Sequence, residues 1–445
     1  MRNRGYGAAL HGNAEGSGGV NTGKTQTTVI SSWMGEVPAH WEVKALKFCA
    51  DLITQRVNGS EAGGEYIGLE HIESKTGKFA RLEGSQESAE SMVSCFGVGD
   101  VLFGKLRPYL AKVAVAESEG ICSSEILVYR PHALNSRYLK HVMLLDSFIE
   151  EVNASTYGSK MPRADAIFIS RLPVPVPPLE EQADIANYLD TETKRIDGLI
   201  EEKNKLKRLL AELRAKTIFE AVTRGVDTTA PMKDSGVSWI GEIPEHWGVK
   251  RVKHIARFTT GWTPPTGDAA SYVGSNPWAN IGDLGPKVIT ETAHQISDEA
   301  VKNTGIKISP VGSLLFSFKL SVGQVSIAGQ PLFTNEAIAT FPPQDEFDIQ
   351  WAYYAFPRFI PENAAVNIYG AKLLNQQRIN DALLPFPPRK EQVAIAGYLN
   401  SETKRIDDLT SYVDSEIELL KELRASTITD SVLGRIDVGQ VAEDQ

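Results

Sequence analysis

The chain has 445 residues and a mass of 48.7 kDa; 42% of its residues are hydrophobic, and its formal net charge is −10. This length suggests two or three domains, and no apolar run approaches the roughly 18 residues of a membrane span. The three cysteines, Cys49, Cys95 and Cys122, are widely spaced, which argues against a disulfide framework or a cysteine zinc site and is typical of a reducing cytoplasm. The acidic total argues mildly against nucleic-acid binding, but acidic helices can hide a basic cleft.

Residues 1–28 are rich in glycine and predict a disordered tail. They have no apolar core behind the two early arginines, so no secretory signal is expected. Within them, GGVNTGKT at residues 18–25 matches the pattern of a phosphate-binding loop letter for letter. Such a loop works between a strand and a helix, and neither is predicted on the required side, so we expect no nucleotide site.

Residues 29–178 predict a first strand-rich domain, because short β-branched and aromatic runs alternate with glycine, proline and asparagine. Two of its loops, FGKLRPYLAK at 103–112 and YGSKMPR at 157–163, combine basic and aromatic side chains. Arginine and lysine suit phosphates and guanine edges, although any single one of them is as readily an ordinary solvated charge. The candidate DNA contacts of this domain are Lys105, Arg107, Tyr109, Lys112, Tyr157, Lys160 and Arg163.

Residues 179–225 predict one long helix, with Pro178 near its start and Gly198 in its interior. Apolar residues recur at alternating steps of four and three, interrupted by Glu192 and Lys203, which is the pattern of a coiled-coil seam. The predicted seam residues are Ile185, Leu189, Ile196, Leu199, Leu206, Leu210 and Leu213. A linker is expected at residues 226–238.

The second half of the chain repeats the first. WMGEVPAHWEVKALK at 33–47 matches WIGEIPEHWGVKRVK at 239–253, and PPLEEQADIANYLDTETKRID at 177–197 matches PPRKEQVAIAGYLNSETKRID at 387–407. A repeat of about 200 residues is far longer than a solenoid unit, so it indicates a duplicated domain. Between these frames the halves diverge, yet corresponding strands remain and Glu125 aligns with Glu336.

Residues 239–388 therefore predict a second strand-rich domain and residues 389–435 a second long helix, followed by a tail at 436–445. The second domain has candidate DNA contacts in matching loops, including glutamines that suit adenine: Lys319, Tyr369, Lys372, Gln376, Gln377 and Arg378. The seam of the second helix, interrupted by Glu402 and Glu416, is Ile395, Leu399, Ile406, Leu409, Val413, Leu420 and Leu423. Each helix is about 65 Å long and heavily charged outside, so we expect the two to pair rather than to pack separately on their own domains.

No motif in the sequence carries catalytic or metal-binding chemistry. His40 and His246 match each other in P-x-H-W, but each lacks a cysteine or carboxylate at ligand spacing, so packing beside the tryptophan is expected. There is no G-x-S-x-G, no H-E-x-x-H and no nuclease-like cluster of Asp and Lys. We therefore expect no catalytic residue, no metal and no cofactor.

Three duplicated motifs, W-x-G-E-x-P-x-H-W, PP-x-x-EQ-x-x-I-A-x-Y-L and ETKRID, occur in the same order in each half. Together they resemble the specificity subunit of type I restriction–modification systems, over about residues 32–438. The resemblance implies an α+β fold in which two mixed, strand-rich target-recognition domains are separated by a long antiparallel pair of helices, with internal pseudo-twofold duplication.

The same resemblance implies a function and a set of partners. The function is that of a non-catalytic subunit that reads a bipartite, asymmetric target in double-stranded DNA, one half-site per domain. The implied partners are two modification (methyltransferase) subunits and the ATP-dependent restriction (translocase and nuclease) subunits, with no membrane. Two other classes stay open: an enzyme whose fused catalysis this segment steers, against which the missing catalytic motifs weigh, and a double-headed scaffold for protein or glycan.

Overall fold

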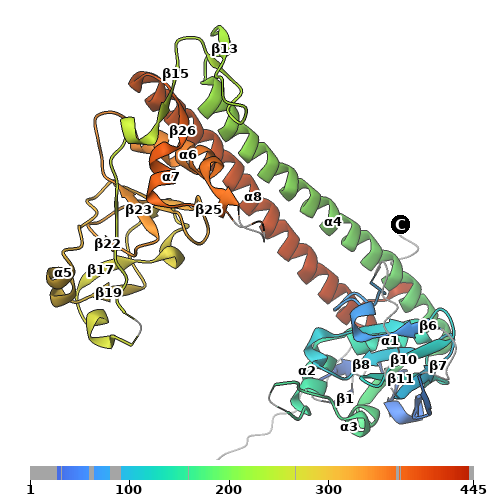
Figure 1. The fold of residues 1–445 in the computed structure, drawn as a ribbon. Coiled ribbons are helices and arrows are strands. Elements are labelled where there is room, and N and C mark those ends of the chain that lie inside the picture. Colours follow the sequence, from blue (N-terminus) through green and yellow to red (C-terminus); the bar gives the residue numbers. More distant parts are fainter. Residues whose placement is uncertain are drawn as a thin grey trace, which may run out of the picture. The chain divides into compact units, whose positions relative to one another are not determined.

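The computed structural model describes residues 28–31, 33–59, 65–80, 92–158, 160–265, 267–366, 370 and 372–439 (Figure 1). Contacts divide the chain into two compact units, one formed by residues 1–201 with 417–445 and the other by residues 202–416. This division runs through both long helices, so each unit combines a strand-rich domain with parts of two helices. GGVNTGKT lies outside the described residues, as does the predicted tail up to residue 27.

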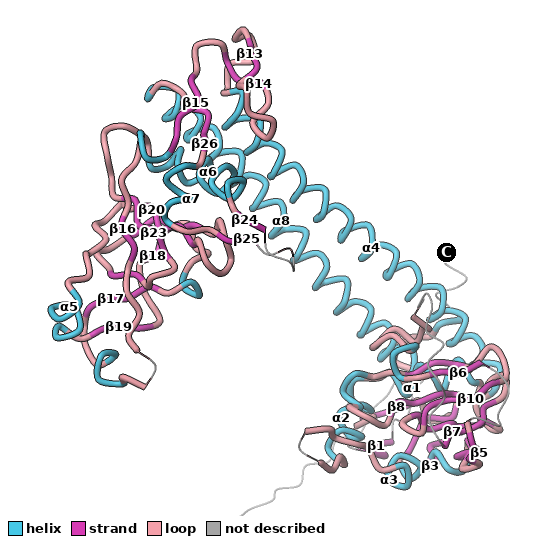
Figure 2. The backbone as a smooth tube through the Cα atoms, in the orientation of Figure 1, coloured by secondary structure: helices cyan, strands magenta, loops and turns pink. Residues whose placement is uncertain are grey.

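The first unit contains two four-stranded sheets, in the orders β4–β11–β8–β9 and β5–β7–β10–β6. Strand β8 of the first sheet and strands β7 and β10 of the second are labelled in Figure 2. The first sheet is antiparallel throughout, whereas β10 and β6 run parallel. The small pairs β1–β2 and β3–β12 complete the strands. The strands are β1 (Thr28–Ser31), β2 (Gly35–Val37), β3 (Glu42–Ala45), β4 (Ala50–Ile53), β5 (Arg56–Asn58), β6 (Glu65–Ile67), β7 (Met92–Phe96), β8 (Val101–Gly104), β9 (Val113–Val115), β10 (Gly120–Ser123), β11 (Ile126–Pro131) and β12 (Pro173–Val176). Its short helices are α1 (Ser136–Leu144), α2 (Asp146–Ala154) and α3 (Ala166–Arg171).

The second unit contains a five-stranded sheet, β16–β23–β20–β21–β18, and a three-stranded sheet, β19–β17–β22. Three strand pairs, β13–β14, β15–β26 and β24–β25, accompany them. The strands are β13 (Met232–Asp234), β14 (Glu242–Pro244), β15 (Gly248–Arg251), β16 (Thr259–Thr260), β17 (Asn276–Ala279), β18 (Val288–Ile289), β19 (His294–Ile296), β20 (Leu314–Ser317), β21 (Val325–Ala328), β22 (Phe333–Thr334), β23 (Ile338–Phe341), β24 (Ala365–Val366), β25 (Lys372–Leu373) and β26 (Leu383–Phe386). Its short helices are α5 (Asp298–Thr304), α6 (Ile349–Phe359) and α7 (Gln376–Asp381). Strand β13 lies within the segment that the sequence predicted as a linker.

The two units repeat one sheet plan. Strand β11 lies between β4 and β8, as β23 lies between β16 and β20. The parallel pair also recurs, because Tyr66 of β6 pairs with Ile121, and Trp278 of β17 pairs with Phe333. Tyr66 and Trp278 occupy matching positions in the two halves of the sequence. The predicted duplication of an α+β, strand-rich domain is therefore confirmed.

The long helices are α4 (Leu179–Arg224) and α8 (Arg389–Val432), and a glycine follows within two residues of the end of each. Gly225 and Gly434 have φ of +76° and +65°, a left-handed conformation that closes a helix and that glycine adopts without steric penalty. A Cβ added to Gly434 would lie 2.8 Å from the ring of Trp41, and one at Gly225 would lie 3.1 Å from the ring of Trp247. In each unit the duplicated tryptophan thus packs beneath a helix end.

The two long helices pair antiparallel within each unit. In the first unit Arg424 Nε donates to Asp197 at 2.8 Å, and in the second unit Arg214 Nε donates to Asp407 at 2.8 Å. The aspartates end the two ETKRID copies and the arginines belong to the two ELRA copies, so each repeated Asp meets the repeated Arg of the other helix. The second unit adds two ion pairs, Lys203–Glu416 at 2.7 Å and Lys207–Asp414 at 2.6 Å. The predicted pairing of the helices is confirmed.

The predicted seam is buried along the row that contains Leu189 and Leu399, while the other row is buried only at its first members, Ile185 and Ile395. The buried members are Ile185, Leu189, Ile196, Leu210, Ile395, Leu399, Ile406 and Val413, while Leu199 and Leu420 are half-buried. The prediction is wrong for four leucines, which are exposed: Leu206, Leu213, Leu409 and Leu423. A repeat of seven drifts by about 20° per heptad on a straight helix, so one row turns away from a single partner helix. Ile417, which the sequence pattern did not select, is buried instead.

The duplicated P-x-H-W and E-Q motifs form one clamp in each unit. Trp41 Nε1 donates to Glu181 Oε1 at 2.9 Å, and His40 Nε2 lies 3.0 Å from the other oxygen of the same carboxylate. In the second unit the matching tryptophan and histidine contact Glu391 at 2.9 and 2.7 Å. The histidine rings also lie edge-on to the tryptophans, with centroids 6.3 and 6.4 Å apart. The motif therefore joins the start of each long helix to the first strands of the domain before it.

The glutamine of each E-Q motif is buried and satisfies backbone groups. Gln182 Oε1 accepts from the amide of Asn135 at 2.7 Å, and its Nε2 donates to a carbonyl at 2.8 Å. Gln392 repeats this arrangement with the amide of Asp348, also at 2.7 Å. Asn135 and Asp348 are the N-caps of α1 and α6, so the start of each long helix is tied to the start of a core helix.

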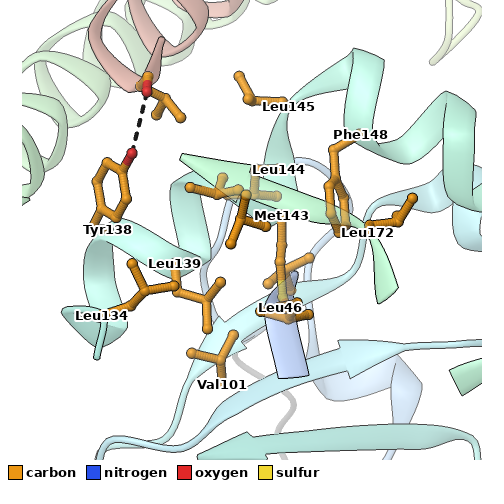
Figure 3. Packing of buried hydrophobic residues seen from close by; sticks show 14 of the residues in the cluster. Leu46, Val101, Leu134, Tyr138, Leu139, Met143, Leu144, Leu145, Phe148 and Leu172 are labelled. Atoms are coloured by element: carbon orange, nitrogen blue, oxygen red, sulfur yellow. Dashed lines mark hydrogen bonds between the residues drawn. The ribbon is translucent and has the colours of Figure 1, made fainter. Parts of the chain in front are cut away.

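The core of the first unit includes the end of α8. Tyr138 is fully buried, and its hydroxyl lies 3.3 Å from the carbonyl oxygens of both Pro175 and Val432, so that its hydrogen is shared between them. Figure 3 shows Tyr138 with one of these hydrogen bonds. Val438 is buried in the same cluster, with Ile436 packed against it. The prediction of a tail from residue 436 is therefore wrong up to residue 439, because these apolar side chains extend the core past the helix.

Candidate nucleic-acid interface

In the first unit, the predicted DNA-contact residues gather at one end of the β4–β11–β8–β9 sheet, where β8 ends and β11 begins. The loop after β8 and the segment 157–163 meet there, because the amide of Arg107 donates to the carbonyl of Pro162 at 2.8 Å. The amide of Ala164 donates to the carbonyl of Lys105 at 2.9 Å, and Tyr157 and Arg163 form a bridge within the segment. Two loops that are about 50 residues apart in sequence thus form one surface.

Two of the predicted contacts have internal roles. Arg163 holds Glu125 with three hydrogen bonds of 3.0 to 3.1 Å, which raise the pKa of the guanidinium. Lys112 Nζ donates to the carbonyl of Leu69 at 2.6 Å and is half-buried. Both side chains join loops to one another, so we assign them to supporting the surface rather than to direct contact.

The remaining predicted side chains of this unit face solvent to different degrees. Arg107, Tyr109, Tyr157 and Lys160 are exposed, and Lys105 is half-buried. Neither Lys105 nor Arg107 forms an ion pair within the described ranges. Three positive side chains are therefore available beside two exposed aromatic rings, a combination that suits phosphates and bases.

In the second unit, the equivalent end of the sheet lies where β20 ends and β23 begins. Lys319 Nζ lies 3.4 Å from Glu336, which also accepts a hydrogen bond from Thr263. Partial burial raises the pKa of Glu336, but the hydrogen bond from Thr263 and the charge of Lys319 outweigh it and hold that pKa below its usual value. Glu336 is therefore ionised at neutral pH, as a hydrogen-bond acceptor beside a lysine.

The other predicted residues of the second unit lie on neighbouring elements. Lys372 Nζ is 3.6 Å from Glu362, Gln376 donates to Thr260 at 3.1 Å, and Gln377 donates to Asp381 at 2.6 Å. Arg378 donates to the carbonyl of Asn363 at 3.0 Å. All four are exposed but engaged, so binding through them would exchange these contacts for new ones. Tyr369 lies outside the described residues.

Sequence reasoning missed the carboxylates of this surface. Glu125 and Glu336 aligned between the halves, and each lies against a predicted basic residue, Arg163 in one unit and Lys319 in the other. Their recurrence at one repeat position beside basic loops was the signal that could have found them. Lys75 was missed as well: its amide donates to the carbonyl of Ala111 at 3.0 Å, which places it beside the loop after β8.

The described residues also bear on metal binding, on membrane spanning and on the acidic side chains of the first unit. In the described ranges, no group of three or more His, Cys, Asp or Glu side chains is placed to hold a metal ion. Among the described helices, none combines the length and the apolar character that a membrane span requires. Two acidic residues of the first unit have structural roles, because Asp100 is buried against Arg130 at 2.8 Å and Asp165 caps α3.

Comparison with known proteins gives consistent matches. The family model described as the type I restriction modification DNA specificity domain matches residues 96–208 and 244–419. The MjaX specificity subunit of a type I restriction enzyme from Methanocaldococcus jannaschii is 24% identical over 430 residues, covering 91% of this chain and 96% of the relative. The EcoDI specificity subunit of Escherichia coli is 27% identical over 182 residues, covering 38% of this chain and 40% of the relative.

Two solved structures share the fold. One chain, from work on complex assembly and conformational transition of the type I restriction–modification system, has a TM-score of 0.74 at 21% identity and covers 90% of this chain and 99% of its own length. The HsdS subunit of Thermoanaerobacter tengcongensis has a TM-score of 0.54 at 19% identity, covering 90% of this chain and 98% of that one.

Proposed function

Because the chain belongs to the type I restriction–modification DNA specificity family, we propose that each of its domains reads one half of a bipartite, asymmetric DNA target. The reading surface in each unit is the sheet end described above, where β8 meets β11 and where β20 meets β23. One observation carries the proposal: two sheets of the same plan present basic loops at the same end, while the sequences of those loops differ. A repeated frame with divergent loops is what two readers of different half-sites require.

The side chains at this end divide into two kinds of contact. Arg107 and Lys160 are exposed cations. Within the described ranges, no hydrogen bond orients either side chain toward a base edge, so both suit phosphate oxygens. Gln376 and Gln377 can offer a donor and an acceptor together, which suits the edge of adenine in the major groove. Phosphate contacts set the register of each domain on the duplex, and base contacts set the sequence.

A salt-dependent binding assay tests this proposal. The full-length chain is mixed with a library of duplexes, and the dissociation constant is measured between 50 and 200 mM salt. Binding through several phosphates should weaken steeply, by a factor on the order of a hundred or more, because DNA releases condensed cations when a protein neutralises it. Flat salt dependence, or no duplex binding, would favour a scaffold for protein or glycan instead.

The chain itself is proposed to be non-catalytic and to bring two cytoplasmic modification subunits, and through the complex the restriction subunits, to the DNA. Its repeated exposed leucines support this: Leu209 and Leu213 in LLAELRA recur as Leu419 and Leu423 in LLKELRA. Exposed apolar side chains that repeat with the fold suit two copies of one partner.

Partner capture tests the leucine surface. Leu213→Ser and Leu423→Ser should each leave one modification subunit bound, and the double variant should bind none; the mass of the complex is the readout. Leu206→Ser is the matched control, because Leu206 is equally exposed but its repeat position holds Glu416. Two bound subunits in the double variant would refute the assignment.

A further inference from the structure

The loop after β8 in the first unit and the loop after β20 in the second each carry an exposed apolar side chain at the tip. In the second unit this is Leu320, which is 72% exposed, and in the first it is Tyr109, which is 48% exposed. Leu320 follows β20, which pairs with β23, and Tyr109 follows β8, which pairs with β11. Single exposed leucines are common on protein surfaces, so exposure alone decides nothing.

The backbone around these two side chains provides a second, independent observation. The described chain contains four non-glycine residues with positive φ, and three of them lie in these two loops. Ser321, next to Leu320, has φ of 48°, while Arg107 and Ala111 bracket the short turn that carries Tyr109 with φ of 52° and 45°. Left-handed backbone at such residues is unfavourable and persists where the surroundings enforce it.

Hydrogen bonds enforce that conformation in both loops. In the second unit the amide of Gly323 donates to the carbonyl of Ser317 at 2.9 Å, and the hydroxyl of Ser317 donates to the carbonyl of Leu320 itself. Phe318 is buried beside this turn, and its amide donates to the carbonyl of Ala337 at 3.0 Å. The side chain of Leu320 thus projects from a backbone that is anchored on both sides.

The first unit braces its turn in a similar way. The amides of Leu110 and Ala111 donate back to Arg107 and Pro108 at 2.9 and 2.8 Å, and the amide of Arg107 donates to Pro162 at 2.8 Å. The ring of Tyr109 therefore stands on a short, closed turn. The two units reach one result, an apolar tip on a stiff loop, with different residues.

Resting on the proposed DNA recognition, we propose that these tips are wedges that press between base pairs at a deformable step of each half-site. Apolar side chains, leucine among them, partly unstack a base step and kink the duplex. A side chain that must push bases apart needs a backbone that does not yield, whereas van der Waals contact with a thymine methyl needs no such bracing. The anchored, left-handed turns favour the wedge. Each wedge would then add selectivity for flexible steps such as TA or CA without hydrogen bonds to their bases.

Leu320 can be tested with the full-length chain and a duplex selected from a random library. Dyes at the two duplex ends report bending, and 2-aminopurine near the half-site of the second domain reports unstacking. Leu320→Ala should lose the bend and the fluorescence rise and should weaken binding about tenfold, which corresponds to 1.4 kcal/mol. The salt slope should not change, because no phosphate contact is lost. Val273→Ala is the control in the same unit, since Val273 is 75% exposed but lies outside this loop.

A backbone variant and a base analogue separate the wedge from its alternative. Ser321→Gly keeps Leu320, relieves the unfavourable positive φ and widens the range of conformations open to the turn, so it should reduce the bend while the thermal stability stays equal or rises. Replacing thymine by uracil in the half-site should leave wild-type binding unchanged.

Three results would overturn the proposal. If Leu320→Ala bound and bent the duplex as Val273→Ala does, Leu320 would not be a wedge, and the proposed DNA recognition would be unaffected. A loss of affinity on uracil substitution without bending would show a methyl contact instead. Failure of the wild-type chain to bind any duplex would overturn the proposed function itself, and the wedge with it.

Discussion

One repeat position in each unit shows how two residues of different chemistry can do the same structural work. His141 is buried on α1, and its Nε2 lies 3.0 Å from Asp190 of α4, which also accepts from Lys140 and Arg137. At the matching position of the second unit, Tyr354 donates to Asn400 at 2.9 Å. Both pairs attach a core helix to a long helix, but the first is charged and the second is neutral.

The charged pair predicts a pH dependence of stability in the first unit. Burial lowers the pKa of His141 to about 4, aided by the charges of Lys140 and Arg424 and opposed by Asp190. Burial raises the pKa of Asp190, but hydrogen bonds from His141 and Lys140 outweigh this and hold it below its usual value. The native state thus holds a neutral histidine that donates to an ionised aspartate.

The sign of the effect follows from the proton count. An unfolded histidine binds a proton near pH 6.5, so between pH 6.5 and about 4 the unfolded state binds more protons and the free energy of unfolding falls as the pH falls. The loss approaches roughly 3 kcal/mol over that range, at about 1.36 kcal/mol per pH unit. The thermal stability of the wild type should therefore fall more between pH 6.5 and 4 than that of His141→Gln. Parallel curves for the two proteins would contradict the prediction.

Lys160 and Lys372, the lysines of YGSK and YGAK, should contact phosphate with unequal effect. Lys160 is exposed and forms no ion pair with the part of the chain that the structure describes, whereas Lys372 lies 3.6 Å from Glu362. Lys160→Ala should weaken binding across sequences and reduce the salt slope by about one. Lys372→Ala should do less, because that lysine is partly neutralised before DNA arrives. If Lys160→Ala left the affinity and the salt slope unchanged, Lys160 would be an ordinary surface lysine that does not contact DNA.

At the scale of elements, the two Asp–Arg pairs between the long helices are identical in sequence but not in environment. Arg424 and Asp197 have side chains that are 13% and 20% exposed, and Arg424 also donates to the carbonyls of Lys75 and Thr76. Arg214 and Asp407 are 37% and 54% exposed. Solvent screens the second pair more strongly, so the repeat should be energetically asymmetric.

Double-mutant cycles measure that asymmetry. Asp197→Asn with Arg424→Gln should give a coupling energy on the order of 1–2 kcal/mol, within the range of networked, partly buried pairs. Asp407→Asn with Arg214→Gln should give about 0.5 kcal/mol or less, as for exposed pairs. The readout is denaturant unfolding, and equal coupling energies would show that burial does not distinguish the two pairs.

The same elements show what the sequence could predict. The duplication, the long helices and their pairing were accessible because each rests on a pattern repeated over many residues, such as ETKRID and the four–three spacing. The sequence pattern wrongly placed Leu206 and Leu213 in the buried seam. A straight helix drifts relative to a seven-residue repeat, and the pattern does not show which row the partner helix covers. Arg163 and Lys112 were predicted as DNA contacts, but their bonds to Glu125 and to the carbonyl of Leu69 depend on tertiary contacts that composition does not encode.

For the whole molecule, the antiparallel helices are proposed to act as a ruler between the half-sites. The ion pairs identify facing positions, since Leu206 lies between Lys203 and Lys207, and Ser415 lies between their partners Asp414 and Glu416. An insertion of seven residues after both Leu206 and Ser415 would lengthen each helix by about 10 Å while keeping the heptad phase.

The insertion should lengthen the preferred gap between half-sites by about three base pairs, since duplex DNA rises about 3.4 Å per base pair. Each half-site should keep its bases, because neither recognition loop is altered. Affinity should fall, since three base pairs also turn the duplex by about 100° and the domains or the DNA must twist to follow. The measurement is selection from a library in which both half-sites are fixed and the gap length is random. A seven-residue insertion in α4 alone is the control, because it breaks the facing ion pairs and should destroy the length preference rather than shift it. If the double insertion folded and still selected the original gap, the helices would not set the spacing.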